Sequence, residues 1–190
     1  MMRIITGKAK GIRLKTLEGD ATRPTAERVK ESVFSMLQFD IDGRTVLDLF
    51  AGSGQMGLEA VSRGAAHATM VDQSKEAIRI IQENATKTKL MADCTIWQGA
   101  ALDFICRNQG KQFDLVFLDP PYASDLYVTT LQALLDGDML KETSLVICES
   151  DTEDFFRSKP SVAERFSVQK SVRYGRVVVT ILGVKREEES

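Results

Sequence analysis

Short apolar runs alternate with amphipathic stretches along most of this 190-residue chain. From Thr45 onward, the apolar runs are rich in branched residues, which is typical of buried parallel strands, and the stretches between them carry apolar residues at helical spacing. Such alternation predicts a parallel sheet with helices on both faces. We expect strands at 45–50, 66–71, 95–98, 113–118 and 144–148, and helices near 55–63, 74–89, 100–107 and 124–135.

The N-terminal part has a different pattern. Two short alternating runs, 3–7 and 11–15, predict a small β-hairpin with basic side chains on one face. Apolar residues at helical spacing then predict a helix that ends near Gln38 and is capped by Thr25, or by Thr22 before the proline. We interpret this part as an extension of the main domain.

Two long strand-like runs, 166–174 and 176–184, close the chain, and their short connection predicts an antiparallel hairpin. We therefore expect an α/β fold: a doubly wound, mostly parallel, seven-stranded sheet with an antiparallel C-terminal hairpin and a small N-terminal β-hairpin plus helix. With 43% hydrophobic residues, the chain is long enough for one well-buried domain. We expect a basic N-terminal extension at 1–40, the main domain at 41–186 and a charged tail at 187–190.

A glycine turn follows the first strand expected in the main domain. Gly52, Gly54 and Gly57 have the spacing G-x-G-x-x-G, and Asp72 lies at the end of the next expected strand. The backbone N–H groups of such a turn and the start of the following helix favour a small polar ligand of the nucleotide type. The spacing alone fits a hydride carrier as well as a methyl donor, and the glycines can also be a purely steric requirement. Asp72 has a competing interpretation as a helix N-cap.

A second informative stretch follows the strand expected at 113–118. It reads Asp119-Pro120-Pro121-Tyr122, which is an acid, two prolines that offer carbonyls without N–H groups, and an aromatic ring. Because the carboxyl ends of parallel strands line one crevice, we expect this stretch and the glycine turn to face the same cavity. An ordinary strand-ending turn is the alternative, although the presence of both motifs in one chain argues against it.

Charge is unevenly distributed along the chain. The formal net charge of -2 argues against nonspecific nucleic-acid binding by the chain as a whole. Residues 1–15 and 165–186, however, are basic and contain no acid. If these ends share a face, they form a phosphate-binding surface. The alternative is a pair of strand edges that lysine and arginine protect against aggregation.

The cysteines and the single histidine argue against a disulfide-bonded protein and against a metal site. Cys94, Cys106 and Cys148 are far apart in apolar surroundings, so we expect reduced thiols rather than disulfides. His67 has no nearby histidine or cysteine partner, and we expect a half-exposed histidine at a strand start and no metal site. No run is long enough to span a bilayer and none resembles a signal peptide. We expect a cytoplasmic monomer with no membrane partner.

Several motifs together resemble one family of methyltransferases. The glycine turn and the stretch 119–122 are similar to those of class I S-adenosylmethionine-dependent amino-methyltransferases, which have a Rossmann-like fold. With segments 3–11, 23–34, 47–65 and 174–175, the chain resembles the bacterial 16S ribosomal RNA guanine-N2-methyltransferases of RsmD type over nearly its whole length. The two N-terminal segments are the more discriminating, because the other motifs occur in many methyltransferases.

The resemblance implies S-adenosylmethionine as cofactor and a guanine N2 of 16S ribosomal RNA, on the assembled small subunit, as methyl acceptor. It implies that Asp119 and the Pro120 carbonyl accept the two hydrogens of the target amine and that Tyr122, after Pro121, stacks on the base. The lone pair of an aromatic amine is delocalised into its ring, and two acceptors would rotate it toward the methyl group. No metal or covalent intermediate is required, and the base has to be unpaired or flipped.

The binding residues implied by the resemblance fall into two sets. The cofactor set is Asp48, Phe50, Ala51, Gly52, Ser53, Gly54, Asp72, Gln73, Ala100 and Ala101. Asp48 would lie near the amino group of the methionine part, Asp72 at the ribose hydroxyls and Gln73 beside the adenine. The family usually has an acid where Ala100 aligns, so one adenine hydrogen bond is missing or comes from the backbone. The candidate substrate-binding residues are Arg3, Lys8, Lys10, Arg13, Arg23 and Arg28, although Arg23 can instead pair with Asp20 or Glu27.

Three rival functions stay open at this point. Another amino-methyltransferase could act on adenine N6 in DNA or RNA, because aspartate before the two prolines does not settle the base. A nicotinamide-dependent oxidoreductase fits the glycine spacing, but the chain has no evident second substrate domain. A noncatalytic RNA-binding module is disfavoured, because the acid, both prolines and the aromatic residue are all present.

Overall fold

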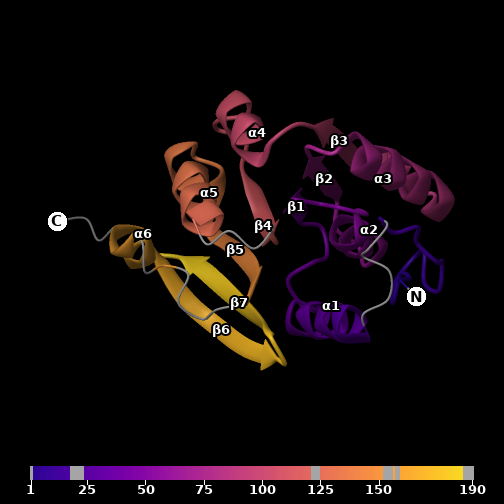
Figure 1. Ribbon diagram of the computed structural model, residues 1–190, viewed down its shortest axis with the longest axis horizontal. Coiled ribbons are helices and arrows are strands. Elements are labelled where there is room, and N and C mark those ends of the chain that lie inside the picture. The colour runs from indigo at the N-terminus through magenta and orange to yellow at the C-terminus, as the bar shows by residue number, and fades with distance from the viewer. Residues whose placement is uncertain (1, 18–23, 121–124, 152–155, 157–158, 186–190) are drawn as a thin grey trace. The chain divides into compact units, whose positions relative to one another are not determined.

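A computed structural model shows how these patterns fold (Figure 1). The structure describes residues 2–17, 24–120, 125–151, 156 and 159–185. The chain divides into two compact units, Met1–Ala101 and Leu102–Ser190.

The first unit contains three parallel strands. β2 (His67–Asp72) lies between β3 (Cys94–Gln98) and β1 (Thr45–Leu49) in the order β3-β2-β1, and Leu47 of β1 pairs with Thr69 of β2. α2 packs on β1 and β2, and α3 packs on β2 and β3. β1 and β2 are almost completely buried, as expected for apolar central strands. The elements are α1 Pro24–Met36, β1 Thr45–Leu49, α2 Gln55–Ser62, β2 His67–Asp72, α3 Lys75–Thr88, the short 3-10 helix η1 Met91–Asp93 and β3 Cys94–Gln98.

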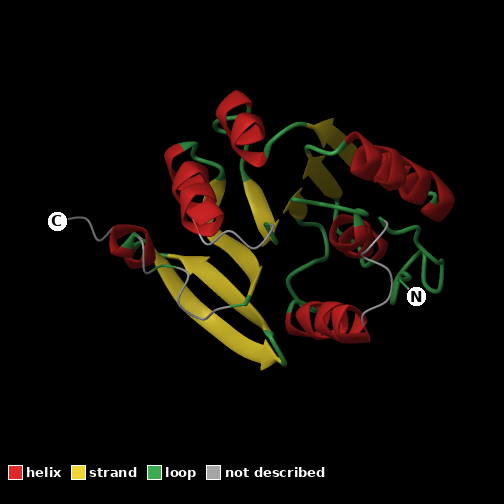
Figure 2. Ribbon diagram, in the orientation of Figure 1, coloured by secondary structure: helices red, strands yellow, loops and turns green. Residues whose placement is uncertain are grey.

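The second unit contains four strands: β4 (Phe113–Leu118), β5 (Leu140–Ser150), β6 (Phe166–Tyr174) and β7 (Val177–Val184). Their order in the sheet is β4-β5-β7-β6. β4 and β5 are parallel, whereas β7 pairs in antiparallel fashion with both β5 and β6. Figure 2 shows the long β6–β7 hairpin clearly. The elements are α4 Ala101–Arg107, which starts at the boundary between the units, β4 Phe113–Leu118, α5 Asp125–Asp136, β5 Leu140–Ser150, α6 Pro160–Glu164, β6 Phe166–Tyr174 and β7 Val177–Val184.

These elements confirm the predicted fold class: seven strands of a mixed sheet, helices between the parallel strands, and an antiparallel C-terminal hairpin. β5 is longer than predicted because its first part is polar and exposed at Glu142 and Thr143, so the apolar pattern begins only later. The helices α6 and η1 were not predicted, because five and three residues are too short for a periodic pattern. His67 begins β2 half-buried, as predicted.

The N-terminal hairpin differs from the prediction. The chain does turn back on itself, with bonds from Ile4 N–H to the Ile12 carbonyl and from Leu14 N–H to the Met2 carbonyl, both at 2.9 Å. Within residues 2–17, however, the only β-pairing is an isolated antiparallel bridge between Arg3 and Arg13. Other backbone groups of this segment bind α1 and α2 instead of a partner strand. The segment is therefore a docked loop and not a regular two-stranded hairpin.

The predicted domain boundaries at residues 40 and 186 stay predictions. The N-terminal extension lies in the same compact unit as β1, β2 and β3, and the tail at 187–190 lies outside the described residues. All three cysteines are free thiols. In the part of the chain that the structure describes, no helix combines the length and apolar character needed to cross a bilayer.

Candidate functional site

The glycine turn has an unusual backbone that the glycines make possible. Phe50, Gly52 and Gly54 have φ values of 66°, 55° and 73°, in the left-handed region that disfavours side chains. The strained position is Phe50, because a bulky residue seldom adopts this conformation and such strain clusters at functional sites. A bond from Ala51 N–H to the Val71 carbonyl at 2.9 Å holds the turn against β2. The turn is thus a fixed loop immediately before α2.

Asp72 connects this turn to the next helix. Its Oδ2 accepts a hydrogen bond from Gly52 N–H and its Oδ1 accepts one from Ser74 N–H, both at 2.8 Å. Ser74, not Asp72, is the N-cap of α3, since the Ser74 hydroxyl accepts from Ala77 N–H at 3.3 Å. The N-cap interpretation of Asp72 is therefore wrong. Each carboxylate oxygen has a second acceptor position, so Asp72 can also receive ligand hydroxyls.

Asp48 is a buried acid beneath the same turn. It is 3% exposed, and its Oδ2 accepts a hydrogen bond from Gly57 N–H at 2.9 Å. Burial raises the pKa of Asp48 to about 7; the Gly57 bond opposes this shift, and the negative charge of Asp72 adds to it. A cationic ligand group beside Asp48 would favour its ionised form. A Cβ added at Gly57 would lie 2.7 Å from Met70 Cγ, so a larger residue here would displace the Met70 side chain.

The turn that follows β3 also contributes to the hydrogen-bonded rim formed by the ends of β1, β2 and β3. Gly99 N–H donates to the Asp72 carbonyl at 2.9 Å, which ties the turn after β3 to the end of β2. Ala100 is half-buried, Ala101 is buried as the first residue of α4, and Gln73 is exposed. The structure thus brings together the predicted cofactor residues of three successive strand ends in the first unit. Ala100 has no side-chain hydrogen-bond acceptor.

The buried polar residues of this unit include Asn84 and Glu59, which the sequence analysis did not predict to bind other segments. The Asn84 amide of α3 donates to the Ser53 carbonyl at 2.9 Å, which fixes the glycine turn from below. Glu59 of α2 is completely buried and accepts hydrogen bonds from the backbone N–H groups of Ile5 and Thr6. Both polar residues stand among apolar neighbours on the buried side of an otherwise regular helix. This interruption of the apolar face was the signal that could have identified them.

The acid of the second motif lies at the end of a completely buried strand. Asp119 is exposed directly after β4, and Pro120 is buried. Pro121 and Tyr122 lie outside the described residues. The buried Tyr127 hydroxyl of α5 donates to the Glu149 carbonyl. Burial, and after it the charge of Asp119, raises the pKa of Tyr127, so this phenol stays protonated at physiological pH.

Asp119 belongs to the second unit, and a cavity shared with the glycine turn stays a prediction.

The candidate substrate-binding residues are mostly on one short segment. We call residues 2–15 the N-terminal segment. Arg23 lies outside the described residues, and Arg28 is exposed on α1. Arg3 forms an ion pair with Glu27 at 2.9 Å, with its side chain 56% exposed. The exposed basic residues of the segment include Arg3, Lys8, Lys10 and Arg13.

The chain matches the family described as Conserved hypothetical protein 95 over residues 2–183. It is 31% identical over 189 residues to the ribosomal RNA small subunit methyltransferase D of Escherichia coli (strain K12), covering 100% of this chain and 93% of the relative. The protein of the same name from Haemophilus influenzae is 34% identical over 154 residues, which is 80% of each chain. The solved structure of a hypothetical protein from Thermus thermophilus has a TM-score of 0.79 at 29% identity and covers 97% of this chain and 100% of that one.

Proposed function

The chain belongs to the Conserved hypothetical protein 95 family, and we propose that it is an S-adenosylmethionine-dependent methyltransferase acting on a guanine N2 of 16S ribosomal RNA. The predicted resemblance to small-subunit ribosomal RNA methyltransferases is confirmed by the relatives that carry this name. The observation that carries the proposal is the Escherichia coli match, because it covers this whole chain, including the N-terminal segment and both motifs.

The cofactor is proposed to bind the rim formed by three strand ends in the first unit. The turn from Phe50 to Gly54 would surround the methionine part, and Asp48 would face its ammonium group. Asp72 would accept hydrogen bonds from the ribose hydroxyls with the lone pairs that Gly52 and Ser74 leave available. The remaining proposed cofactor contacts are Gln73, Ala100 and Ala101.

The methyl acceptor is proposed to bind Asp119 and the Pro120 carbonyl, with Pro121 and Tyr122 completing the motif. When bound, S-adenosylmethionine would supply the methyl group to the amine nitrogen and would leave as S-adenosylhomocysteine. The nitrogen becomes cationic in this step, and its extra proton passes to Asp119 or to water. Positioning and electrostatic stabilisation of the amine supply the catalysis, and the chemistry requires no metal.

The proposed macromolecular partner is the small ribosomal subunit. Exposed arginine and lysine side chains of the N-terminal segment and of α1 would contact RNA phosphates, which fix the register of a nucleic acid without reading its sequence. The proposed RNA-contacting residues are Arg3, Lys8, Lys10, Arg13, Arg23 and Arg28. We propose that the enzyme acts in the cytoplasm and as a monomer.

The test is incubation with labelled S-adenosylmethionine and small subunits from a strain that lacks the modification, with naked RNA in parallel. Nucleoside analysis is expected to show N2-methylguanosine in the subunit sample. N6-methyladenosine would favour the rival adenine methyltransferase, and no transfer to any RNA would contradict the proposal. Calorimetry with NAD and with S-adenosylhomocysteine distinguishes the methyltransferase from the oxidoreductase alternative. Tight NAD binding without S-adenosylhomocysteine binding would exclude a methyltransferase.

A further inference from the structure

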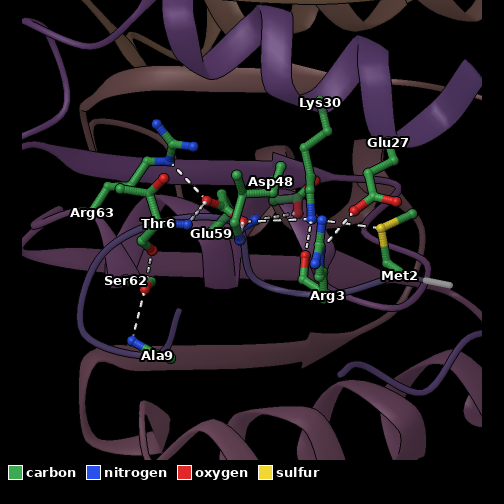
Figure 3. Close-up of polar contacts among 12 residues, drawn as sticks. Met2, Arg3, Thr6, Ala9, Glu27, Lys30, Asp48, Glu59, Ser62 and Arg63 are labelled. Atoms are coloured by element: carbon green, nitrogen blue, oxygen red, sulfur yellow. Dashed lines mark hydrogen bonds and ion pairs between the residues drawn. The ribbon is translucent and has the colours of Figure 1, made fainter. Parts of the chain in front are cut away.

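A buried ionic network lies beside the N-terminal segment (Figure 3). Glu59 of α2 is completely buried, and the side chain of Lys30 of α1 is 1% exposed. The Lys30 ammonium lies 3.5 Å from Glu59 Oε2, and Arg63 Nε lies 2.8 Å from Glu59 Oε1. One carboxylate therefore faces two cations in the interior of the first unit.

The network binds the backbone of the N-terminal segment directly. Glu59 accepts hydrogen bonds from Ile5 N–H at 2.8 Å and from Thr6 N–H at 3.0 Å. Lys30 donates to the carbonyl of Arg3 at 2.5 Å. Hydrogen bonds to charged groups are roughly twice as strong as neutral ones. The network therefore determines where this part of the segment lies on α2.

Ser62, at the end of α2, extends the same attachment. Its hydroxyl donates to the Thr6 carbonyl at 2.6 Å and accepts from Ala9 N–H at 3.0 Å. Its carbonyl accepts from Lys8 N–H at 2.8 Å. The backbone of residues 5–9 is thus bound repeatedly to α2, and the Arg3 carbonyl is bound to α1.

The side chains of the N-terminal segment are divided between core and solvent. Its apolar residues anchor the segment in the core, and its basic residues are left exposed. The buried residues are Ile4, Ala9 and Leu14, and the exposed basic ones include Arg3, Lys8, Lys10 and Arg13.

The helix that holds this segment also begins at the glycine turn. α2 starts directly after Gly54, and Gly57 N–H in its first turn donates to Asp48. Glu59 follows two residues later. Eight helical residues span about 12 Å, so a short rigid rod joins the proposed cofactor turn to the attachment of the segment.

We propose that Glu59, together with Lys30, is a positioning residue for RNA binding: it fixes the register of the N-terminal segment on α2 and holds the exposed basic side chains ready for ribosomal RNA phosphates. This inference rests on the function proposed above. Stability alone does not require a buried ion pair, because apolar residues of similar volume often stabilise a core as well or better. An ordered segment, in contrast, reduces the entropy lost when RNA binds.

The test compares Glu59→Gln with Glu83→Gln. Glu83 also pairs with a cation of the N-terminal segment, at 2.8 Å from Lys15 Nζ, but its side chain is 43% exposed, which makes it a matched control. Four quantities are measured: affinity for S-adenosylhomocysteine, affinity for small subunits, kcat and KM for methyl transfer to small subunits, and hydrogen exchange of the amides at residues 5–9.

For Glu59→Gln we expect faster exchange of these amides and a rise of about tenfold in the Kd and KM for small subunits, from the loss of bonds to a charged acceptor. Its affinity for S-adenosylhomocysteine should stay within about twofold of wild type, because the hydrogen bonds that hold Asp48, Asp72 and the glycine turn do not involve Glu59. Glu83→Gln should match wild type in all four measurements.

Two results would overturn the inference: unchanged subunit affinity in folded Glu59→Gln protein, or equal losses of subunit and S-adenosylhomocysteine affinity, which indicate a purely structural role. If Glu59→Gln does not fold, Lys30→Met serves instead, because it removes the bond to the Arg3 carbonyl and leaves the Arg63 pair of Glu59 in place. Normal subunit binding by Lys30→Met would equally overturn it. Failure of the proposed function can be told apart from failure of this inference. In the first case wild-type protein would transfer no methyl group to small subunits, whereas subunit binding and hydrogen exchange would still report on Glu59.

Discussion

Asp72 Oδ2 accepts a hydrogen bond from Gly52 N–H at 2.8 Å, so one carboxylate holds the end of β2 to the turn that follows β1. The other oxygen of the same carboxylate holds Ser74 N–H at the start of α3. Three elements are therefore ordered around Asp72 by bonds within the chain. A cofactor whose ribose binds this carboxylate would meet a site that is already formed, which limits the entropy lost on binding.

Replacement of Asp72 by alanine should weaken both the fold and the cofactor site. The variant loses two charge-assisted hydrogen bonds, and we expect its free energy of unfolding to fall by about 2–4 kcal/mol. Affinity for S-adenosylhomocysteine should fall by at least about tenfold, because the proposed ribose acceptor is lost. Calorimetry and denaturant unfolding measure the two effects. Glu76→Ala, which changes an exposed residue in the first turn of α3, is the control. If Asp72→Ala binds S-adenosylhomocysteine as tightly as wild type does, Asp72 is not the ribose acceptor.

The raised pKa of Asp48 predicts a specific dependence of stability on pH. The pKa is about 7 in the folded protein, against an ordinary value of 3.8. Between these values the unfolded chain loses a proton that the folded protein keeps, so the contribution of Asp48 to stability declines as pH rises from about 4 to about 7. The total change is at most about 4 kcal/mol. Asp48→Asn, which mimics the protonated acid, should lack this decline; parallel unfolding curves for the two proteins would contradict the shift.

Cofactor affinity should depend on pH through the same residue. An ammonium group beside Asp48 stabilises the ionised carboxylate, so ligand binding near pH 6 should release a proton from Asp48. We therefore expect the affinity for S-adenosylhomocysteine to rise with pH by up to about tenfold per unit below about pH 7. Calorimetry in buffers of different ionisation enthalpy counts the proton. The Asp48→Asn variant should release none, and proton release by this variant would assign the effect to another group.

The sequence predicts those parts of the molecule that depend on local patterns. The strands from β1 to β4 follow from apolar runs bounded by turn residues. The sequence also places Asp72 at the end of the strand next to the glycine turn, although the hydrogen bond between Asp72 and Gly52 was not predicted. The binding partners of Glu59 could not be predicted in this way. Its backbone partners Ile5 and Thr6 lie 54 and 53 residues earlier in the chain, and no local pattern encodes such a contact.

Contacts between residues far apart in the chain also explain why the N-terminal segment does not form the predicted regular hairpin. Alternating residues at 3–7 and 11–15 are compatible with two strands, but Glu59, Lys30 and Ser62 take up backbone groups that a regular hairpin would pair. Tertiary bonds from two helices therefore override the local strand preference, which depends strongly on context.

Loss of the Asp119 carboxylate should affect methyl transfer rather than cofactor binding. Asp119 is exposed after β4, where it is proposed to accept a hydrogen of the target amine. Asp119→Ala should therefore slow methyl transfer by about two to four orders of magnitude, while S-adenosylhomocysteine affinity stays nearly unchanged. Single-turnover transfer to small subunits measures the first quantity and calorimetry the second. Unchanged turnover would show that Asp119 is not an acceptor.

Gly7 and Gly11 form a matched pair that separates backbone strain from docking of the N-terminal segment. Their φ values are 87° and 82°, so alanine at either position incurs the same left-handed penalty of about 1–2 kcal/mol. At Gly7 an added Cβ would lie 1.7 Å from the Ser62 carbonyl oxygen, whereas at Gly11 nothing lies within 4 Å. Only Gly7→Ala must therefore displace the segment from α2.

We expect Gly7→Ala to lower the Tm further than Gly11→Ala does and to weaken small-subunit binding by about tenfold or more, because the exposed basic residues lose their common support. Gly11→Ala should retain normal subunit affinity, since its cost is confined to the local backbone. Thermal unfolding and subunit co-sedimentation measure both variants under identical salt, because phosphate contacts weaken as salt rises. Equal subunit affinities for the two variants would mean that docking on α2 does not govern RNA binding.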